Sequence, residues 1–184
     1  MERRLVAISK FLSYVLRHHP ESERLSIDEH GWAAVDDLLA SPGAKTRGLS
    51  RAILDQVVSE NDKQRFEFHR SGTKIRARQG HSLFVDLDLC ELKPPRCLNH
   101  GTASHALASI RVSGLLRGRR QQVHLSPDTA TAKKVGGRHG RPVVLGIRAE
   151  EMYEHGYRFF ASGNGVWLTE GVPPEFIDFP DLEI

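Results

Sequence analysis

Apolar residues recur at three- and four-residue spacing at the start of the chain, and this period predicts an amphipathic helix. The apolar stripe consists of Leu5, Ile8, Leu12, Val15 and Leu16. Because Pro20 disfavours the α conformation of the residue before it, we expect this helix to end near His18. Arg17 and His18 then lie together on its last turn.

The pattern that follows predicts a short strand, two further helices and a hairpin in the first half of the chain. Residues 25–27 read as a short strand, and residues 35–39 as a short helix closed by Ser41-Pro42-Gly43. Ser50 is a candidate N-cap for a third helix, with Leu49 placed to contact Leu54 inside it. Alternating residues 65–69 and 74–78 flank a Ser-Gly turn and predict a hairpin. Three helices followed by a two-stranded wing favour a winged-helix lobe, a fold often used on nucleic acid.

The second half of the chain has a different texture. We predict a strand over residues 83–89, then a linker over residues 91–96, because the pair Pro94-Pro95 cannot continue a ladder. This gives lobes of residues 1–92 and 96–184 in an α+β fold. Helices are expected around residues 106–110, closed by Gly114, and over 129–134, with Ser126-Pro127 as N-cap and N1. The strands predicted in this lobe are 98–102, 122–125, 143–147, 157–160 and 166–169.

Composition limits the class of protein. The 184 residues are 39% hydrophobic and 27% charged, as in an ordinary soluble domain, and no apolar run reaches the length of a membrane span. The first residues alternate charged and apolar types, unlike a signal peptide. Cys90 and Cys97 are too few for a disulfide framework or a cysteine-based zinc site. We therefore expect a cytoplasmic protein that makes no membrane contact.

Charge is segregated along the chain, although the net charge is only +3. Residues 117–141 contain seven Lys or Arg and one Asp, whereas residues 149–184 contain eight acids and one Arg. A local basic block suggests a site for a polyanion, but two solvated faces that balance each other explain it equally well. The pair Arg17 and His18 has two readings as well, a phosphate site or cations that complement a helix C-terminus. Arg76 and Arg78 lie on one face of the predicted hairpin and add a second phosphate-suited group.

Common nucleotide and metal motifs are missing from the sequence. It contains neither a phosphate loop of the Gly-x4-Gly-Lys type nor Gly-x-Gly-x-x-Gly after a strand. Among the ten histidines, no pair has the helical spacing of a metalloprotease site with its glutamate, so we expect no metal.

Six short segments, in register over nearly the whole chain, resemble the NAD-dependent RNA 2′-phosphotransferases. They are Leu16-Arg17-His18-His19-Pro20, Ile75-Arg76-Ala77-Arg78-Gln79-Gly80-His81-Ser82, His100-Gly101-Thr102, Val123-His124-Leu125-Ser126, Val135-Gly136-Gly137-Arg138-His139-Gly140 and Asn164-Gly165-Val166-Trp167-Leu168-Thr169. The resemblance implies a winged-helix lobe that binds RNA, followed by an ADP-ribosyltransferase-like lobe with a split β-sheet that binds NAD.

The same resemblance implies a two-step reaction on RNA that carries an internal 2′-phosphate of the tRNA splice-junction type. The phosphate attacks the nicotinamide ribose of NAD, which releases nicotinamide and leaves an RNA-2′-phospho-ADP-ribose intermediate. The ribose 2″-hydroxyl then attacks phosphorus, releasing 2′-hydroxyl RNA and ADP-ribose 1″,2″-cyclic phosphate. NAD is thus a consumed co-substrate, no metal is required, and we expect a monomer.

The matching positions imply roles for individual residues. The catalytic group is Arg17, His18, Arg76 and Arg138. The positions assigned to NAD are His100, Gly101, Thr102, His124, Ser126, Asn164 and Val166. Without the resemblance, His100 and His124 would read as packed strand histidines. Arg78 departs from the family pattern, which favours an amide there, and Val166 stands where protein-modifying ADP-ribosyltransferases carry a glutamate.

Two alternatives remain open from the sequence. One is an ADP-ribosyltransferase that modifies terminal nucleic-acid phosphates and stops after the first step. The other is a winged-helix DNA-binding regulator whose second lobe senses NAD without chemistry.

Overall fold

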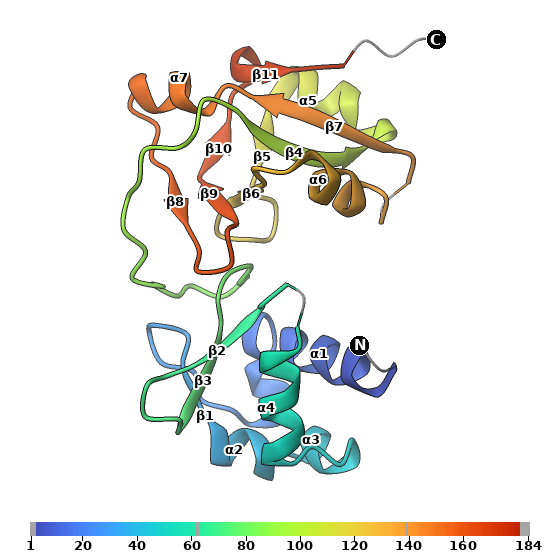
Figure 1. Cartoon of the computed structure of the whole chain (residues 1–184), viewed down its shortest axis with the longest axis vertical. Coiled ribbons are helices and arrows are strands. Elements are labelled where there is room, and N and C mark those ends of the chain that lie inside the picture. The colour runs from blue at the N-terminus through green and yellow to red at the C-terminus, as the bar shows by residue number, and fades with distance from the viewer. Residues whose placement is uncertain (1–2, 62, 139, 181–184) are drawn as a thin grey trace. The chain divides into compact units, whose positions relative to one another are not determined.

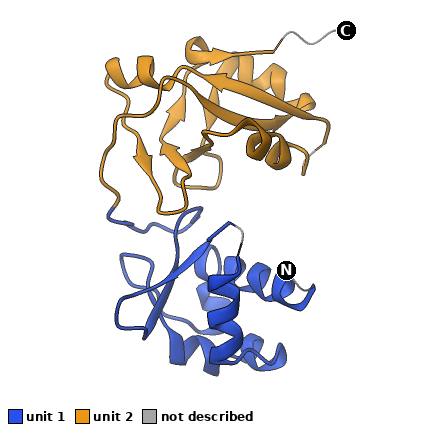
Figure 2. Ribbon diagram, viewed as in Figure 1, with its two compact units in different colours: residues 1–88 blue, residues 89–184 orange. Residues whose placement is uncertain are grey.

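The computed structural model describes residues 3–61, 63–138 and 140–180, so His139 of the sequence motif lies outside the described residues. Helices and short strands occur in both halves of the chain, without regular alternation, which is consistent with the α+β class (Figure 1). The chain divides into two compact units, residues 1–88 and residues 89–184 (Figure 2). No helix in the described part of the chain is long and apolar enough to cross a bilayer.

The first unit combines helices with one antiparallel sheet. Its helices are α1 (Arg3–Arg17), a 3-10 turn (Pro20–Glu23), α2 (Val35–Ala40), α3 (Pro42–Thr46) and α4 (Arg51–Ser59). Its strands are β1 (Ala33–Ala34), β2 (Phe66–Phe68) and β3 (Lys74–Ala77), in the order β1-β3-β2.

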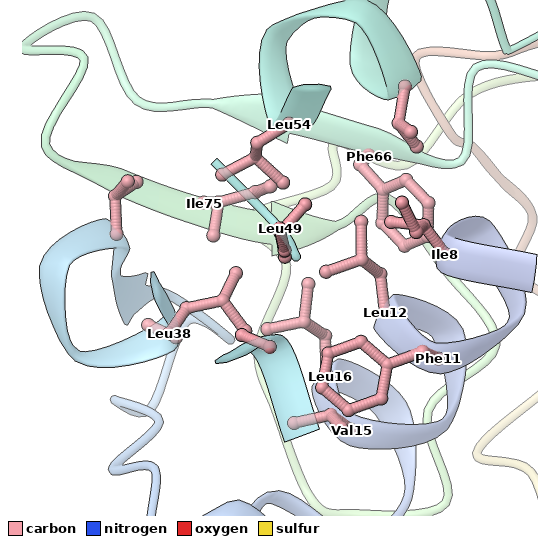
Figure 3. Packing of buried hydrophobic residues seen from close by; sticks show 14 of the residues in the cluster. Ile8, Phe11, Leu12, Val15, Leu16, Leu38, Leu49, Leu54, Phe66 and Ile75 are labelled. Atoms are coloured by element: carbon pink, nitrogen blue, oxygen red, sulfur yellow. The ribbon is translucent and has the colours of Figure 1, made fainter. Parts of the chain in front are cut away.

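The predicted apolar stripe of α1 forms the centre of this unit's core. All five of its residues are buried, and Leu12, Val15 and Leu16 are wholly inaccessible. They pack in one cluster with residues of α2, α4 and the hairpin, including Leu54, Phe66 and Ile75 (Figure 3). Burial of side chains of this size stabilises a fold by about 1.5–3 kcal/mol each. The polar face of α1 is therefore fixed outward.

The hairpin is also confirmed, and its register is set by the turn at Ser71-Gly72. Glu67 lies opposite Arg76, and Phe68 lies opposite Ile75. Gly72 has a φ of 71°, the left-handed conformation that favours glycine at such a turn. The register therefore places one acidic and one basic side chain directly across from each other.

Two predictions for the first half need correction. The strand expected at residues 25–27 is reduced to a single bridge between Ile27 and Ala33. Ser41-Pro42-Gly43 ends α2 and also begins a helix that was not predicted, α3. Ser41 is the N-cap of α3, and its hydroxyl accepts a hydrogen bond from the Ala44 amide. Pro42 occupies the first turn of that helix, where its missing N–H is not needed.

The strand predicted over residues 83–89 is wrong. This segment forms no ladder; the amide of Asp86 donates to the Glu29 carbonyl, and Asp88 has a φ of 55°, which breaks an extended run. Val85 is buried beside Gly31. The apolar residues alternate with polar ones because single side chains, such as Val85, pack near Gly31, and not because the segment pairs in a sheet.

The second unit consists of short strands and helices. Its helices are α5 (Leu107–Ser113), α6 (Thr129–Gly136), α7 (Ala149–Glu154) and the 3-10 turns Ser104–Ala106 and Pro174–Phe176. Its strands are β4 (Leu98–Ala103), β5 (Leu115–Leu116), β6 (Val123–Leu125), β7 (Pro142–Ile147), β8 (Phe160–Ala161), β9 (Trp167–Thr169), β10 (Gly171–Val172) and β11 (Ile177–Asp178).

Two three-stranded sheets dominate this unit, with orders β11-β7-β4 and β6-β9-β8. A single antiparallel bridge joins β4 to β6, through reciprocal Asn99 and Ser126 backbone hydrogen bonds of 2.7 and 2.9 Å. The strand predicted over residues 157–160 is shifted, since only Phe160 of that range lies in β8. The two three-stranded sheets thus meet at the Asn99–Ser126 bridge.

Helix α6 packs closely on β4, and two glycines permit this approach. A Cβ added at Gly101 would lie 1.7 Å from the Ala132 carbonyl oxygen, and one added at Gly136 would lie 2.4 Å from the Thr102 carbonyl oxygen. The N-cap of α6 is Asp128, not Ser126 as predicted. The Asp128 carboxylate accepts hydrogen bonds from the amides of Ala130 and Thr131.

We expect Gly101→Ala to lower the free energy of unfolding by at least about 2–3 kcal/mol, because the added methyl group overlaps backbone that has no room to move. Thermal unfolding followed by circular dichroism measures the loss. Gly137→Ala is the matched control, since its Cβ would meet no atom closer than 3.5 Å. Equal stability of the two variants would contradict this packing explanation.

Candidate functional site

The C-terminal end of α1 carries the first candidate pair, Arg17 and His18, and the chain that leaves the hairpin returns to it. The amide of Ser82 donates to the Arg17 carbonyl at 3.0 Å. The Ser82 hydroxyl lies 3.0 Å from Nδ1 of His18. Ser82 therefore satisfies a helix-terminal carbonyl and orients the imidazole ring at the same time.

The guanidinium of Arg17 lies against the backbone of the same returning segment. An atom at the Cβ position of Gly80 would be 3.4 Å from Nη1 of Arg17, and Gly80 has a φ of 90°. The guanidinium carbon is 6.0 Å from the centre of the Phe66 ring. Glycine thus meets two requirements here, a left-handed backbone and close contact with a cation.

Arg76 of β3 is held on three sides. Its Nε donates to Glu67 at 2.7 Å, its Nη1 donates to the His30 carbonyl at 3.1 Å, and its guanidinium carbon lies 4.3 Å from the Trp32 ring centre. Glu67 is also within 3.5 Å of Arg78. The side chain of Arg76 is only 15% exposed, so its position is fixed by packing and pairing.

His81 lies among these groups and is 1% exposed. Burial, followed by the charges of Arg17, His18 and Arg76, lowers the pKa of His81 to about 3. The ring is therefore neutral at physiological pH. Arg17, His18 and Arg76 all act electrostatically on this one buried ring, so all three side chains lie in its neighbourhood.

The second unit contains a separate basic group at the junction of its sheets. Nδ1 of His100 on β4 lies 3.1 Å from the His124 carbonyl on β6, and Nη1 of Arg120 lies 3.3 Å from Nδ1 of His124. Burial lowers the pKa of His100; the hydrogen bond that its Nδ1 donates to the His124 carbonyl opposes this shift, and the charge of Arg120 adds to it. Desolvation, and then the charge of Arg138, lower the pKa of Arg120, which places Arg138 near this group.

The remaining candidates of the second unit have local structural roles. Gly101 and Thr102 lie on β4 where α6 packs. The Ser126 hydroxyl donates to the Asp128 carbonyl beside the α6 cap. In the turn between β8 and β9, the Ser162 hydroxyl contacts the Asn164 side chain at 2.7 Å and the Val166 carbonyl at 3.0 Å. These contacts account for Gly101, Ser126 and Asn164 without a ligand. His100 and His124, in contrast, lie beside the cation Arg120.

Sequence reasoning did not single out Glu67, Trp32, His81 or Arg120 as parts of these groups. The signal for Glu67 was present, because a hairpin centred on residues 71 and 72 pairs position 67 with position 76. Burial of His81 had no such signal. No cluster of three or more His, Cys, Asp or Glu side chains that could hold a metal occurs in the part of the chain that the structure describes.

The depressed pKa of His81 makes stability depend on pH. Between about pH 6.5 and 3 the unfolded chain binds a proton that the folded chain does not, so stability is complete above pH 6.5 and falls as the pH is lowered. We expect His81→Phe to remove about 2–3 kcal/mol of the loss between pH 7 and 4.5, measured by urea unfolding at each pH. His105→Gln, at an exposed histidine, is the control. Parallel pH profiles for wild type and His81→Phe would refute the assignment.

Comparison with known proteins points to one family. The model of the RNA 2′-phosphotransferase, Tpt1 / KptA family, matches residues 3–171. A probable RNA 2′-phosphotransferase of Acaryochloris marina is 51% identical over 176 residues, covering 96% of this chain and 97% of the relative. Proteins of the same name from Agrobacterium fabrum and Escherichia coli O6:K15:H31 are 53% and 48% identical, and cover 93% and 97% of this chain and 92% and 97% of their own lengths. The chain belongs to the RNA 2′-phosphotransferase family.

Proposed function

We propose that this protein removes an internal 2′-phosphate from RNA by transferring it to NAD. The observation that carries the proposal is the grouping of Arg17, His18 and Arg76 around His81 at the end of α1. A phosphate monoester carries about −1.5 to −2 charges at neutral pH, so it needs more than one cation to be held against water. Two guanidinium groups and an imidazole meet that need.

The proposed roles in the first unit follow from how each side chain is held. Arg76, fixed by Glu67 and stacked on Trp32, would present its remaining N–H groups to the phosphate as a rigid donor. Arg17 would complete the clamp. His18, oriented by Ser82, would hydrogen-bond the phosphate and move a proton. Because the phosphate is already anionic, the first step needs no strong base, which fits Val166 at the position where related transferases carry a glutamate.

The second unit would bind NAD, whose glycosidic bond to nicotinamide supplies the leaving group of the reaction. Its residues fit a dinucleotide, because the cation Arg120 lies beside His124, as a pyrophosphate requires, at the place where the two sheets join through one bridge. His100 and His124 are the residues we favour for this contact, with Thr102, Ser126, Asn164 and Val166 around them. Gly101 would act chiefly by letting α6 pack on β4.

The products we propose are nicotinamide, 2′-hydroxyl RNA and ADP-ribose 1″,2″-cyclic phosphate, formed through RNA-2′-phospho-ADP-ribose. In the first step a phosphate oxygen displaces nicotinamide. In the second, the ribose 2″-hydroxyl attacks phosphorus and the RNA 2′-oxygen leaves with a proton. Arg138 would stabilise the charge that builds on phosphorus in that step, an effect worth on the order of 3 kcal/mol for one placed donor. Since guanidinium groups provide this stabilisation, the proposal requires no metal ion.

We also propose the identity of each lobe. The order of helices followed by the β2–β3 hairpin supports a winged-helix RNA-binding lobe over residues 1–92. The two three-stranded sheets support an ADP-ribosyltransferase-like lobe over residues 96–184. The substrate would be RNA of the tRNA splice-junction type, acted on by a cytoplasmic monomer.

The direct test is incubation of the protein with a 2′-phosphorylated oligoribonucleotide, with and without NAD, followed by mass spectrometry of all products. We expect 2′-hydroxyl RNA, nicotinamide and the cyclic phosphate in equal amounts, and only when NAD is present. Stable transfer of ADP-ribose to a terminal phosphate would favour the modifying transferase instead. Binding of NAD without any product would favour the regulator.

The Arg138→Ala variant separates the two steps. Because Arg138 would act at phosphorus and not at the ribose, we expect nicotinamide release to continue while RNA-2′-phospho-ADP-ribose accumulates, with the second step slowed about 100-fold or more. Gel analysis of end-labelled RNA over time measures the intermediate. Arg141→Ala, which removes a neighbouring exposed cation, is the control. Normal turnover by Arg138→Ala would show that its proposed role is wrong.

A further inference from the structure

A groove of about 380 Å³ runs along α1 and is lined by residues of the first unit alone. The lining residues are Val6, Ser9, Lys10, Ser13, Tyr14, Arg17, His18 and Arg65. All but Arg65 come from α1 and the residue after it, at helical spacing; Ser9 is buried, and the others lie outside the buried stripe. A cavity of this size accommodates one nucleotide. Arg17 and His18 line the groove at the C-terminal end of α1.

The charge of this groove has one sign. Lys10, Arg17 and Arg65 line it, and no acidic residue does. Moreover, α1 contains no Asp or Glu over its 15 residues and begins with two arginines, although the helix dipole favours acids in the first turn. A solvated helix face ordinarily mixes the two signs, because Glu–Lys pairs one turn apart stabilise the helix. The basic face of α1 is therefore not explained by the stability of the helix.

An aromatic side chain lies among these cations. Tyr14 is 50% exposed, one turn from Lys10, and its ring centre is 4.8 Å from that of His19 at an angle of 32°. Cations that follow a phosphate backbone beside an exposed aromatic ring are the usual composition of sites for single-stranded nucleic acid, where a base stacks on the ring.

We propose that this groove binds the nucleotide next to the 2′-phosphorylated one, with its backbone phosphate on Lys10 and Arg65 and its base on Tyr14. The proposal rests on the proposed function, because it starts from the 2′-phosphate at Arg17 and His18. The groove also extends the proposed function, because contacts to a neighbouring nucleotide would favour a 2′-phosphate inside a single-stranded RNA over one on an isolated nucleotide.

The test compares two substrates that carry the same 2′-phosphate, a single-stranded oligoribonucleotide with several nucleotides on each side and a nucleoside 2′-phosphate. The quantity is the ratio of kcat/KM for the long substrate to that for the short one. We expect Lys10→Ser and Tyr14→Ser each to lower this ratio at least about fivefold, mainly through KM for the long RNA. We expect Tyr14→Phe, which keeps the aromatic face, to stay within about twofold of wild type.

A salt series gives a second readout for Lys10. Loss of one contact to a single-stranded backbone should reduce the slope of log KM against log salt by about 0.7 for the long RNA. Lys45→Ser, at an exposed lysine of α3 outside the groove, should change neither the ratio nor the slope. Circular-dichroism melts confirm that each variant is folded.

An unchanged ratio in both Lys10→Ser and Tyr14→Ser would overturn the proposal, as would an equal loss on both substrates. Should the wild type turn over neither substrate, the proposed function fails on its own, and fluorescence anisotropy of the labelled single-stranded RNA then decides about the groove. In that measurement the same variants must weaken binding at least about fivefold relative to Lys45→Ser. Equal RNA affinity for all variants would show that the face is only solvated.

Discussion

The arrangement of the first unit depends on how the C-terminal end of α1 is capped. The last carbonyls of a helix lack partners within it, and here the Ser82 amide, supplied by a segment 65 residues further along the chain, bonds to the Arg17 carbonyl. The same residue holds His18 through its hydroxyl. Because the apolar stripe fixes the rotation of α1 and Ser82 fixes its end, the directions of Arg17 and His18 are set by the core and not by a ligand.

A carboxylate performs the equivalent task for Arg76. Its ion pair with Glu67 is largely buried, and removing one partner of such a pair costs more than the pair contributes, since the other charge is left desolvated. Arg76 therefore supports the fold as well as the proposed chemistry. Loss of activity in a variant that lacks Arg76 would have two causes, whereas Arg17 and Arg138 offer simpler tests.

The sequence predicted those elements whose signal is local and repeated. The stripe of α1, the hairpin around Ser71-Gly72 and the close of α5 at Gly114 were all predictable, because periodicity or turn chemistry specifies them. The segment 83–89 was mistaken for a strand because alternation does not reveal whether a partner edge exists. The two-residue strands β5, β10 and β11 are too short for any period. In the site, Arg17, His18 and Arg76 stood out as phosphate-suited and the resemblance gave them roles, while the burial of His81 arises from contacts distant in sequence.

Charged groups from two elements of the first unit act on one buried ring, that of His81. Arg17, His18 and Arg76 all disfavour protonation of a ring that burial has already made neutral. Glu67 pairs with both Arg76 and Arg78 beside this ring. A cation that only complemented the C-terminus of α1 would gain nothing from Arg76 on β3. Nor would it gain from the buried imidazole of His81, whose ring nitrogens have no hydrogen-bond partner among the described residues. Binding of a dianion would lower the energy of all three cations together, and this accounts for a cluster that stability alone would not favour.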